Sequence, residues 1–455
     1  MLGIGIFLAP SIVAERVGSI QNFYLMWACG GLIALAGSVA YAELGQILPK
    51  SGGDYVFQRE AFGESIAFAS GWLLFLAVFG GSIAAVAVGL CEYQLSALFG
   101  LDLTSVHLFG ISIAKLIALM IVIGFTFLNR FACSISGTIQ GILTIGPILL
   151  LAAGTLYAFG TTEPTSAAGT AAATAAETST WTHTNLFFGF VMAYLPIYFA
   201  FSGWNGVIFL AGEVKNPARN LPLGLFLGTA VVTVLYLLLC AGFIHVIGFE
   251  GLTQVDEAGS EAAGILGGST ARIFITICIA LGLMASLNGT ILGGARVGFA
   301  MAKDGVLWSG FSRLSNGGNI PERALWLQAG WACLLILTES FEVILDLVSL
   351  AMLLSGSITV LSLYVLRDNK KSEESKRSIM YWMRKICPPL FIGVNALVFI
   401  GIAVEAWHSG MEGFDRFLGV ILFVLAFLFH RLTMVVFGFP ARASRQSTLT
   451  TTKFN

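Results

Sequence analysis

Long apolar stretches follow one another along nearly the whole chain, separated by short polar segments. A helix needs about 20 apolar residues to cross a bilayer. The stretches lie at residues 24–48, 66–98, 106–128, 134–159, 185–212, 223–247, 270–301, 324–338, 343–366, 387–407 and 417–439, with a shorter one at 2–14. With 57% hydrophobic and 11% charged residues, the chain also lacks the polar surface of a soluble protein. It is therefore predicted to be an all-α, polytopic membrane protein with about twelve transmembrane helices.

Basic residues fall mainly in alternate loops, and this predicts the orientation because Lys and Arg are retained on the cytoplasmic side. If residues 49–63 are cytoplasmic, the same side receives Lys50, Arg59, Arg130, Lys215, Arg219, Lys303, Arg313, Arg323 and the cluster from Arg367 to Lys385. The opposite loops carry Arg16, Arg272 and Arg416. We therefore predict a multi-pass protein of the plasma (inner) membrane, surrounded by the lipid bilayer, with both termini in the cytoplasm.

Two apolar segments are interrupted where a membrane helix should be continuous: GIGIF at 3–7 and FAFSGWNG at 199–206. An unpaired backbone N–H or C=O is costly in hydrocarbon, so a break at membrane depth indicates a cavity or a ligand. The breaks fall in the first and the sixth predicted helix. A five-helix repeat inserted twice with opposite topology would bring them side by side, as in transporters with broken helices.

The two breaks together could recognise a zwitterion. Free amides around the first break start a helix whose positive dipole end suits a carboxylate. Carbonyls before the second break can accept hydrogen bonds from an ammonium group. The candidate substrate-binding residues are Gly3, Ile4, Gly5 and Ile6 in the first break, and Phe199, Ala200, Phe201, Ser202 and Gly203 in the second. The alternative for the glycines of the first break is close helix packing between small residues.

Several segments carry a family resemblance. GIGIFLAP at 3–10, YAELGQILPKSGGDYVFQREAFG at 41–63 and FAFSGWNGVIFLAGEVKNPARNLP at 199–222 resemble hallmark stretches of the amino acid/polyamine/organocation (APC) superfamily. ARVGFAMAKDG at 295–305 is most similar to the L-type amino acid transporters and their bacterial relatives. The resemblance implies a 5+5 inverted repeat of the LeuT type with helices 1 and 6 broken, plus two C-terminal helices. It also implies that helix 1 amides bind the substrate carboxylate, that helix 6 carbonyls bind its amine, and that Phe199 closes over the ligand.

The predicted organisation follows from this resemblance. Residues 1–366 form a ten-helix transport core, 367–386 a basic cytoplasmic linker, 387–439 helices 11 and 12, and 440–455 a disordered cytoplasmic tail. Relatives have a half-helix before the first break, so we expect that helix 1 is N-terminally truncated by a misassigned start at Met1. The inner segment 49–63 has Asp54, Arg59, Glu60 and the adjacent Glu64 available to pair, which predicts either gating ion pairs or a simple solvated loop.

Polar residues within apolar stretches are candidates for ion coupling or gating. Ser286 and Asn288 place oxygens in helix 8, and sodium-coupled members of the fold bind a cation between helices 1 and 8. Helix–helix hydrogen bonding is the alternative. Many sodium-independent relatives instead carry a lysine on helix 5, where this chain has Pro147. Lys115, which we predict in mid-span of helix 4, is a candidate substitute for that charge, with snorkelling or pairing as the alternative.

We expect a secondary active transporter that moves amino acids by alternating access, through exchange or ion-coupled symport. We identify no acidic residue near the predicted breaks, which favours neutral amino acids as substrates. The alternatives are an amino-acid sensor that binds without translocating, and a cationic amino acid or polyamine antiporter. The chain carries no enzyme motif, so we expect no catalytic residues, metal or cofactor, and no nucleic-acid partner. The resemblance to eukaryotic L-type transporters implies a cysteine in the loop between helices 3 and 4 that joins a single-span partner glycoprotein. The corresponding loop here, at about 99–105, has no cysteine, so no disulfide-linked heavy subunit is expected.

Overall fold

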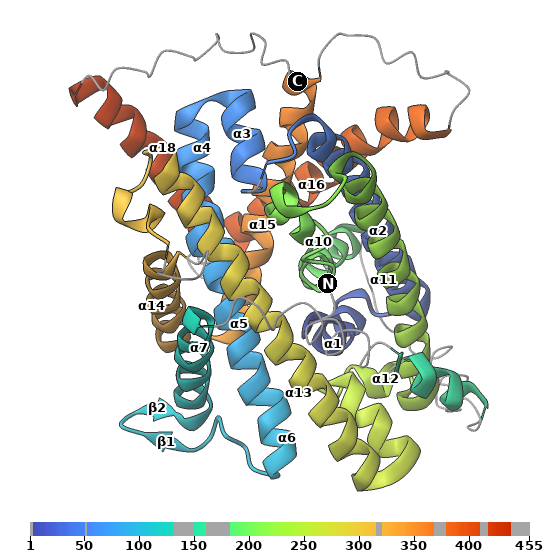
Figure 1. The fold of residues 1–455 in the computed structure, drawn as a ribbon. Coiled ribbons are helices and arrows are strands. Elements are labelled where there is room, and N and C mark those ends of the chain that lie inside the picture. Colours follow the sequence, from blue (N-terminus) through green and yellow to red (C-terminus); the bar gives the residue numbers. More distant parts are fainter. Residues whose placement is uncertain are drawn as a thin grey trace.

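Long helices make up most of the described chain. The computed structural model describes residues 3–50, 52–131, 149–150, 152–160, 183–314, 321–367, 379–409 and 417–437, and its helices pack side by side in one bundle (Figure 1). Within these ranges, 7 helices or continuous helical runs are long and apolar enough to cross a membrane. The structure therefore supports an integral, multi-pass helical membrane protein. The count of twelve spans and the inverted repeat stay predictions.

The N-terminal part contains two long helices, a short one, and an irregular helical run. The first three are α1 (Gly5–Val17), α2 (Ile20–Ile47) and α3 (Asp54–Phe62). The run consists of α4 (Glu64–Trp72), η1 (Leu73–Gly80), α5 (Gly81–Gly89), η2 (Leu90–Leu95) and α6 (Ser96–Phe99), of which η1 and η2 are π-helical. Gly18 ends α1 at a left-handed φ of 65°. Ser19 then begins α2, because its hydroxyl accepts a hydrogen bond from the Asn22 amide.

The middle of the chain holds the second broken helix and the longest helix. It comprises the antiparallel hairpin β1 (His107–Leu108) and β2 (Ile111–Ser112), then α7 (Ile113–Phe131), α10 (His183–Ala200), the 3-10 helix η3 (Gly206–Glu213), α11 (Pro217–Ile247), α12 (Phe249–Leu252), α13 (Ala258–Lys303) and the 3-10 helix η4 (Ser309–Ser312). α13 bends at Gly267 and Gly268, whose backbone angles are not helical. The segment 248–269, which links two predicted spans and is acidic, is mostly helical.

The C-terminal part consists of α14 (Glu322–Thr338), α15 (Phe341–Leu366), α16 (Ile379–Ser409) and α18 (Leu418–Phe437). α16 begins at Ile379 and not at residue 387, so part of the linker predicted at 367–386 is helical. Arg367 donates two hydrogen bonds to the Glu43 carboxylate, at 2.8 and 2.7 Å, and this ties the end of α15 to the end of α2. The predicted tail at 440–455 lies outside the described residues.

Small residues let α2 approach two other helices closely. A Cβ on Gly30 would lie 2.3 Å from a side-chain carbon of Ile197 on α10, and a Cβ on Gly31 would lie 2.2 Å from Thr233 on α11. These distances leave room for a hydrogen atom but not for a methyl group. α2 therefore packs directly on α10, the helix whose end forms the second break.

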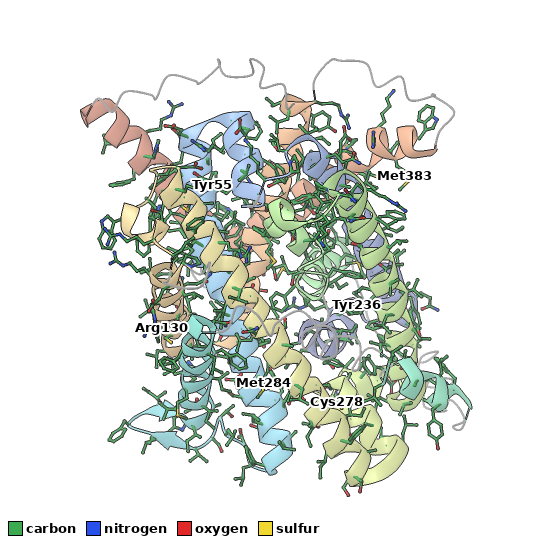
Figure 2. All side chains as sticks on the ribbon, viewed as in Figure 1. Tyr55, Arg130, Tyr236, Cys278, Met284 and Met383 are labelled. Atoms are coloured by element: carbon green, nitrogen blue, oxygen red, sulfur yellow. The ribbon has the colours of Figure 1, made fainter. Side chains whose placement is uncertain are left out.

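Apolar side chains also cover the outside of the bundle. On α11, Leu227, Val231 and Val234 are 50%, 60% and 68% exposed. Figure 2 shows side chains that point outward from helices around the bundle. A contiguous apolar outer surface is unfavourable in water and favourable against lipid. The helices therefore bury one face against each other and present the other to the bilayer.

Candidate functional site

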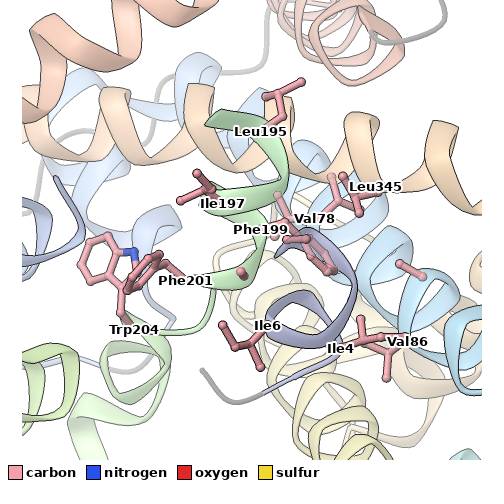
Figure 3. Close-up of a cluster of buried hydrophobic side chains, with 14 of the residues drawn as sticks. Ile4, Ile6, Val78, Val86, Leu195, Ile197, Phe199, Phe201, Trp204 and Leu345 are labelled. Atoms are coloured by element: carbon pink, nitrogen blue, oxygen red, sulfur yellow. The ribbon is translucent and has the colours of Figure 1, made fainter. Parts of the chain in front are cut away.

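The two predicted breaks lie side by side. α10 ends at Ala200, the chain turns through Gly203 at a φ of 84°, and η3 resumes at Gly206. α1 begins at Gly5, where a Cβ would lie only 2.5 Å from the Cα of Ala200. Figure 3 shows Ile4 and Ile6 of α1 next to the segment that carries Phe199. The adjacency that the sequence predicted is therefore present, and it depends on backbone contact between the two helices.

A cavity of about 520 Å³ opens at this crossing. Most of the predicted substrate-binding residues line it: Gly3, Ile4, Gly5, Phe199, Ala200, Ser202 and Gly203. Ile6 and Phe201 are not among the lining residues. The Ile6 side chain is fully buried, and the Phe201 ring packs on Trp27 and Tyr236, with ring centroids 6.2 and 5.0 Å apart. The side chains of these two residues therefore belong to the hydrophobic core.

The N-terminus of α1 provides the positive side of the cavity. Ile4 is the N-cap residue, and no side chain caps this helix end. Its carbonyl accepts from the Phe7 and Leu8 amides, at 3.0 and 3.2 Å, which starts the helical hydrogen-bond pattern. Amides at the first turn of a helix have no acceptor within that helix, and the helix dipole adds partial positive charge there. Because Ile4 and Gly5 line the cavity, this charge acts on whatever occupies it.

The carbonyl groups of the second break already have partners. The Phe199 carbonyl accepts from the Ser202 amide at 2.9 Å, and the Ala200 carbonyl accepts from the Tyr236 hydroxyl, also at 2.9 Å. A carbonyl oxygen has two lone pairs, so each can accept a second hydrogen bond. These contacts hold the interrupted backbone in position while one acceptor site on each oxygen remains.

The polar residues of α13 face the same cavity. Ser286 and Asn288 both line it, and the Ser286 hydroxyl lies 3.8 Å from where a Cβ on Gly3 would stand. The Asn288 side-chain oxygen accepts from the Asn129 side-chain amide of α7 at 2.7 Å. That contact is the helix–helix hydrogen bond named above as the alternative. A cation site at Ser286 and Asn288 stays a prediction.

Lys115 does not lie where the sequence analysis placed it. It is the third residue of α7, because residues 107–112 form the hairpin and the helix begins only at Ile113. Its Nζ donates to the Glu339 carbonyl at 3.0 Å, at the end of α14. The mid-span position was therefore wrong, and Lys115 is not among the residues that line the cavity. Pro147, the proposed site of the missing lysine, lies outside the described residues.

Asp54 is the site residue that the sequence analysis missed. It was assigned to a loop at 49–63, but most of that segment is α3, and Asp54 is its first residue. The side chain is buried, with 2% exposed, and it lines the cavity. The Ser355 hydroxyl of α15 donates to Asp54 Oδ2 at 3.2 Å, and burial raises the pKa of the carboxyl to about 7. The statement that no acidic residue lies near the breaks was therefore wrong.

A glycine pair explains how Asp54 reaches this position. Gly53 has a φ of 60°, and a Cβ there would lie 2.3 Å from the Phe209 ring of η3. The Gly52 amide donates to the Phe209 carbonyl at 3.3 Å. Only glycine tolerates this combination of backbone angle and close approach. The Gly-Gly-Asp sequence before an amphipathic segment was the signal that could have revealed a buried helix start.

α3 lies at the end of the bundle that is at the top of Figure 1, which we call the α3 end. Ion pairs hold it there. Arg59 on α3 pairs with Asp304, just beyond α13, at 2.7 Å, and Lys50 pairs with Glu60 at 3.3 Å. Of the charged residues named for this segment, Arg59 and Glu60 form ion pairs, with Asp304 and Lys50, whereas Asp54 forms none among the described residues; because most of the segment is helical, the alternative of a simple solvated loop is wrong. That they form in one conformational state only stays a prediction.

The start of one helix and the break in another meet at a cavity within a helical membrane protein, and this arrangement is typical of membrane transporters. Residues 1–450 match the family model of the amino acid permeases, and the chain belongs to this family. The predicted relationship to the APC superfamily is confirmed. Its members are transporters and not enzymes.

Similar proteins come from bacteria and mammals. The chain is 27% identical over 383 residues to the serine/threonine exchanger SteT of Bacillus subtilis (strain 168), covering 83% of each chain. It is 25% identical over 467 residues to the b(0,+)-type amino acid transporter 1 of Mus musculus, covering 98% of this chain and 88% of the relative. It is 26% identical over 371 residues to the large neutral amino acids transporter small subunit 2 of Homo sapiens, covering 81% and 68%. These relatives are named as amino acid transporters or exchangers.

Proposed function

We propose that this protein is a secondary active transporter that moves neutral amino acids across the membrane by alternating access, through exchange or ion-coupled symport. The observation that carries the proposal is the crossing of α1 and α10 at Gly5 and Ala200, where α1 begins and α10 breaks off beside the cavity. Breaks placed in this way present amide donors and carbonyl acceptors to one ligand. The names of the relatives support amino acids as that ligand.

The substrate would lie across the two helix breaks. Its α-carboxylate would meet the amides at the N-terminus of α1, and its α-ammonium group would meet the carbonyls of Phe199 to Phe201. Phe199 lines the cavity with 5% of its surface exposed, so its ring is placed to cover the ligand. Val78 and Val86 add apolar surface for the substrate side chain.

The charges of the cavity favour a neutral substrate. Asp54 and Arg296 both line it. The Asp54 side chain is only 2% exposed and accepts a hydrogen bond from Ser355, so little of its carboxyl is available to a substrate. A cationic side chain would be repelled by Arg296, and a buried carboxyl that favours its protonated form would not offset that repulsion.

We further propose the orientation that the basic loops predict, with the α3 end in the cytoplasm. A second cavity of about 620 Å³ opens at this end, and Lys50, Arg59 and Lys303 line it. Positive charge on one side of a multi-pass protein is typical of its cytoplasmic side. In alternating access, this cavity would be the exit on the cytoplasmic side.

The test is transport by the purified full chain in liposomes. Vesicles loaded with unlabelled serine or leucine are expected to accumulate the labelled amino acid by counterflow, and unlabelled lysine and putrescine are expected not to compete. Imposed proton and sodium gradients then separate exchange from symport. Binding without flux would support the sensor instead, and uptake of lysine or putrescine would support the cationic antiporter; either result would contradict the proposal.

A further inference from the structure

A network of buried polar groups surrounds Asp54, beyond what substrate binding requires. Gln58, one turn along α3, donates to the Ser355 carbonyl at 3.1 Å and to the Thr359 hydroxyl at 2.8 Å. The Ser70 hydroxyl of α4 donates to the Gln58 side-chain oxygen. Together with the bond from Ser355 to Asp54, these contacts join α3 to α15 through hydroxyl and amide groups.

The Asp54 carboxyl is not balanced by a cation. None of the described residues forms an ion pair with it, and its Oδ1 is buried without a hydrogen-bond partner among them. The Tyr41 hydroxyl, on α2 and near this carboxyl, is also buried without such a partner. An ionised carboxylate in this environment is unfavourable, whereas a protonated carboxyl is not. The packing seen here therefore suits the protonated form.

Asp54 also lies at the boundary between the two cavities. Asp54 lines the central cavity, and Gly52 lines the cavity at the α3 end. Gly53, between them, packs on Phe209, which is also part of the central lining. The turn at 52–54 is thus part of the wall that separates the two spaces. Arg59, on the same helix, holds the wall in place through Asp304.

Few other ionisable groups surround the carboxyl. Among the described residues, the ionisable side chains that interact with the carboxyl or line the same cavity are Tyr41 on α2, Tyr198 on α10 and Arg296 on α13; α3 itself adds Tyr55 and Arg59, of which Arg59 is paired with Asp304. α15 contributes the hydroxyls of Ser355 and Thr359. Tyrosines and arginines keep one protonation state near neutral pH, so Asp54 is the group of this set that can exchange a proton there.

We propose, building on the transport function proposed above, that the Asp54 carboxyl is a proton-binding site. When the proton is bound, α3 stays packed against α15 and the wall between the two cavities stays closed. One proton therefore crosses the membrane with each amino acid. The proton enters with the substrate through the central cavity. On release, the O–H bond of the carboxyl breaks, its electron pair stays on the oxygen, and the proton passes to water at the α3 end. The remaining carboxylate is unfavourable in the apolar packing, so α3 moves away and the wall opens.

The test measures proton and amino acid movement together in liposomes that contain a trapped pH-sensitive dye. Wild-type protein is expected to move protons inward with serine. Uptake should rise by up to about tenfold for each unit by which the outer pH is lowered toward the site's midpoint, and it should level off below that midpoint. In Asp54→Asn, whatever serine counterflow remains should be independent of pH and without proton movement. Asp102→Asn, in the exposed turn after α6, is the matched control and should behave as wild type.

A second variant covers the case in which Asp54→Asn is inactive. Ser355→Ala removes a donor that favours the ionised carboxylate, so the pH midpoint of uptake should move upward. Net serine uptake into serine-free vesicles without proton movement in the wild type would overturn this inference and leave the proposed function standing. Absence of counterflow would overturn the proposed function itself. An unaltered proton-to-serine ratio in Asp54→Asn, or an unaltered midpoint in Ser355→Ala, would also overturn the inference.

Discussion

At the scale of single residues, Gly5 combines two roles that the sequence analysis treated as alternatives. It starts the helix whose amides face the cavity, and it allows the α1 backbone to touch α10 at Ala200. The group that a side chain would meet is backbone, which cannot rotate away as a side chain can. Close packing and a helix break are therefore one feature at this residue.

We expect Gly5→Ala to reduce serine counterflow about tenfold or more, because a methyl group must push α1 off α10 at a cost of about 1–3 kcal/mol. Gly228→Ala on α11 is the control, since a Cβ there would meet no atom within 4 Å. The measurement is initial counterflow rate per amount of monodisperse protein. Equal rates for the two variants would show that the crossing does not shape the site.

Asp54 should make stability depend on pH. Its pKa is about 7 in the folded protein and 3.8 as the ordinary value, so the folded state binds a proton that the unfolded chain has lost. This stabilisation is fully present below pH 4 and declines as the pH rises to about 7, by at most about 1.4 kcal/mol per pH unit. The thermal unfolding midpoint in detergent should fall between pH 5 and pH 7.5, and the fall should be smaller in Asp54→Asn. Equal falls in both proteins would contradict the assignment.

At the scale of elements, the apolar stretches predicted most of the long helices well. Their positions follow from the length of chain that a bilayer requires, which is independent of the tertiary structure. α3 was missed because a segment with Asp, Gln, Arg and Glu is polar by composition. Its burial depends on partners from distant segments, such as Ser355 for Asp54 and Asp304 for Arg59. Lys115 was misplaced because the apolar stretch at 106–128 includes the hairpin, and hydrophobicity alone does not show where the hairpin ends and α7 begins.

The two ion pairs of the α3 region should differ in strength. Arg59 and Asp304 are 32% and 25% exposed, whereas Lys50 and Glu60 are 61% and 44% exposed. Water and salt screen the second pair more strongly. A double-mutant cycle with Arg59→Ala and Asp304→Ala should give a coupling of about 1 kcal/mol in thermal unfolding, and one with Lys50→Ala and Glu60→Ala a coupling of about 0.2 kcal/mol. If the coupling energy between Arg59 and Asp304 is no larger than that between Lys50 and Glu60, the Arg59–Asp304 ion pair does not hold α3 against the end of α13.

At the scale of the whole molecule, the two ends of the bundle have different charges and structures. The α3 end carries Lys50, Arg59 and Lys303 around the second cavity. The opposite end carries the hairpin at 107–112 and the acidic segment with Glu250 and Asp256. Because Lys and Arg next to spans are retained in the cytoplasm, this asymmetry allows one orientation to be tested directly.

We expect a cysteine at Ser105, in the loop before the hairpin, to react with a membrane-impermeant thiol reagent on intact cells. A cysteine at Lys50, at the α3 end, should react only after the membrane is permeabilised. Both side chains are exposed, so burial does not limit either reaction. The variants are Ser105→Cys and Lys50→Cys in a background without the 7 native cysteines, which serves as the unlabelled control. The opposite pattern would place the α3 end outside, and the proton would then leave Asp54 toward the exterior.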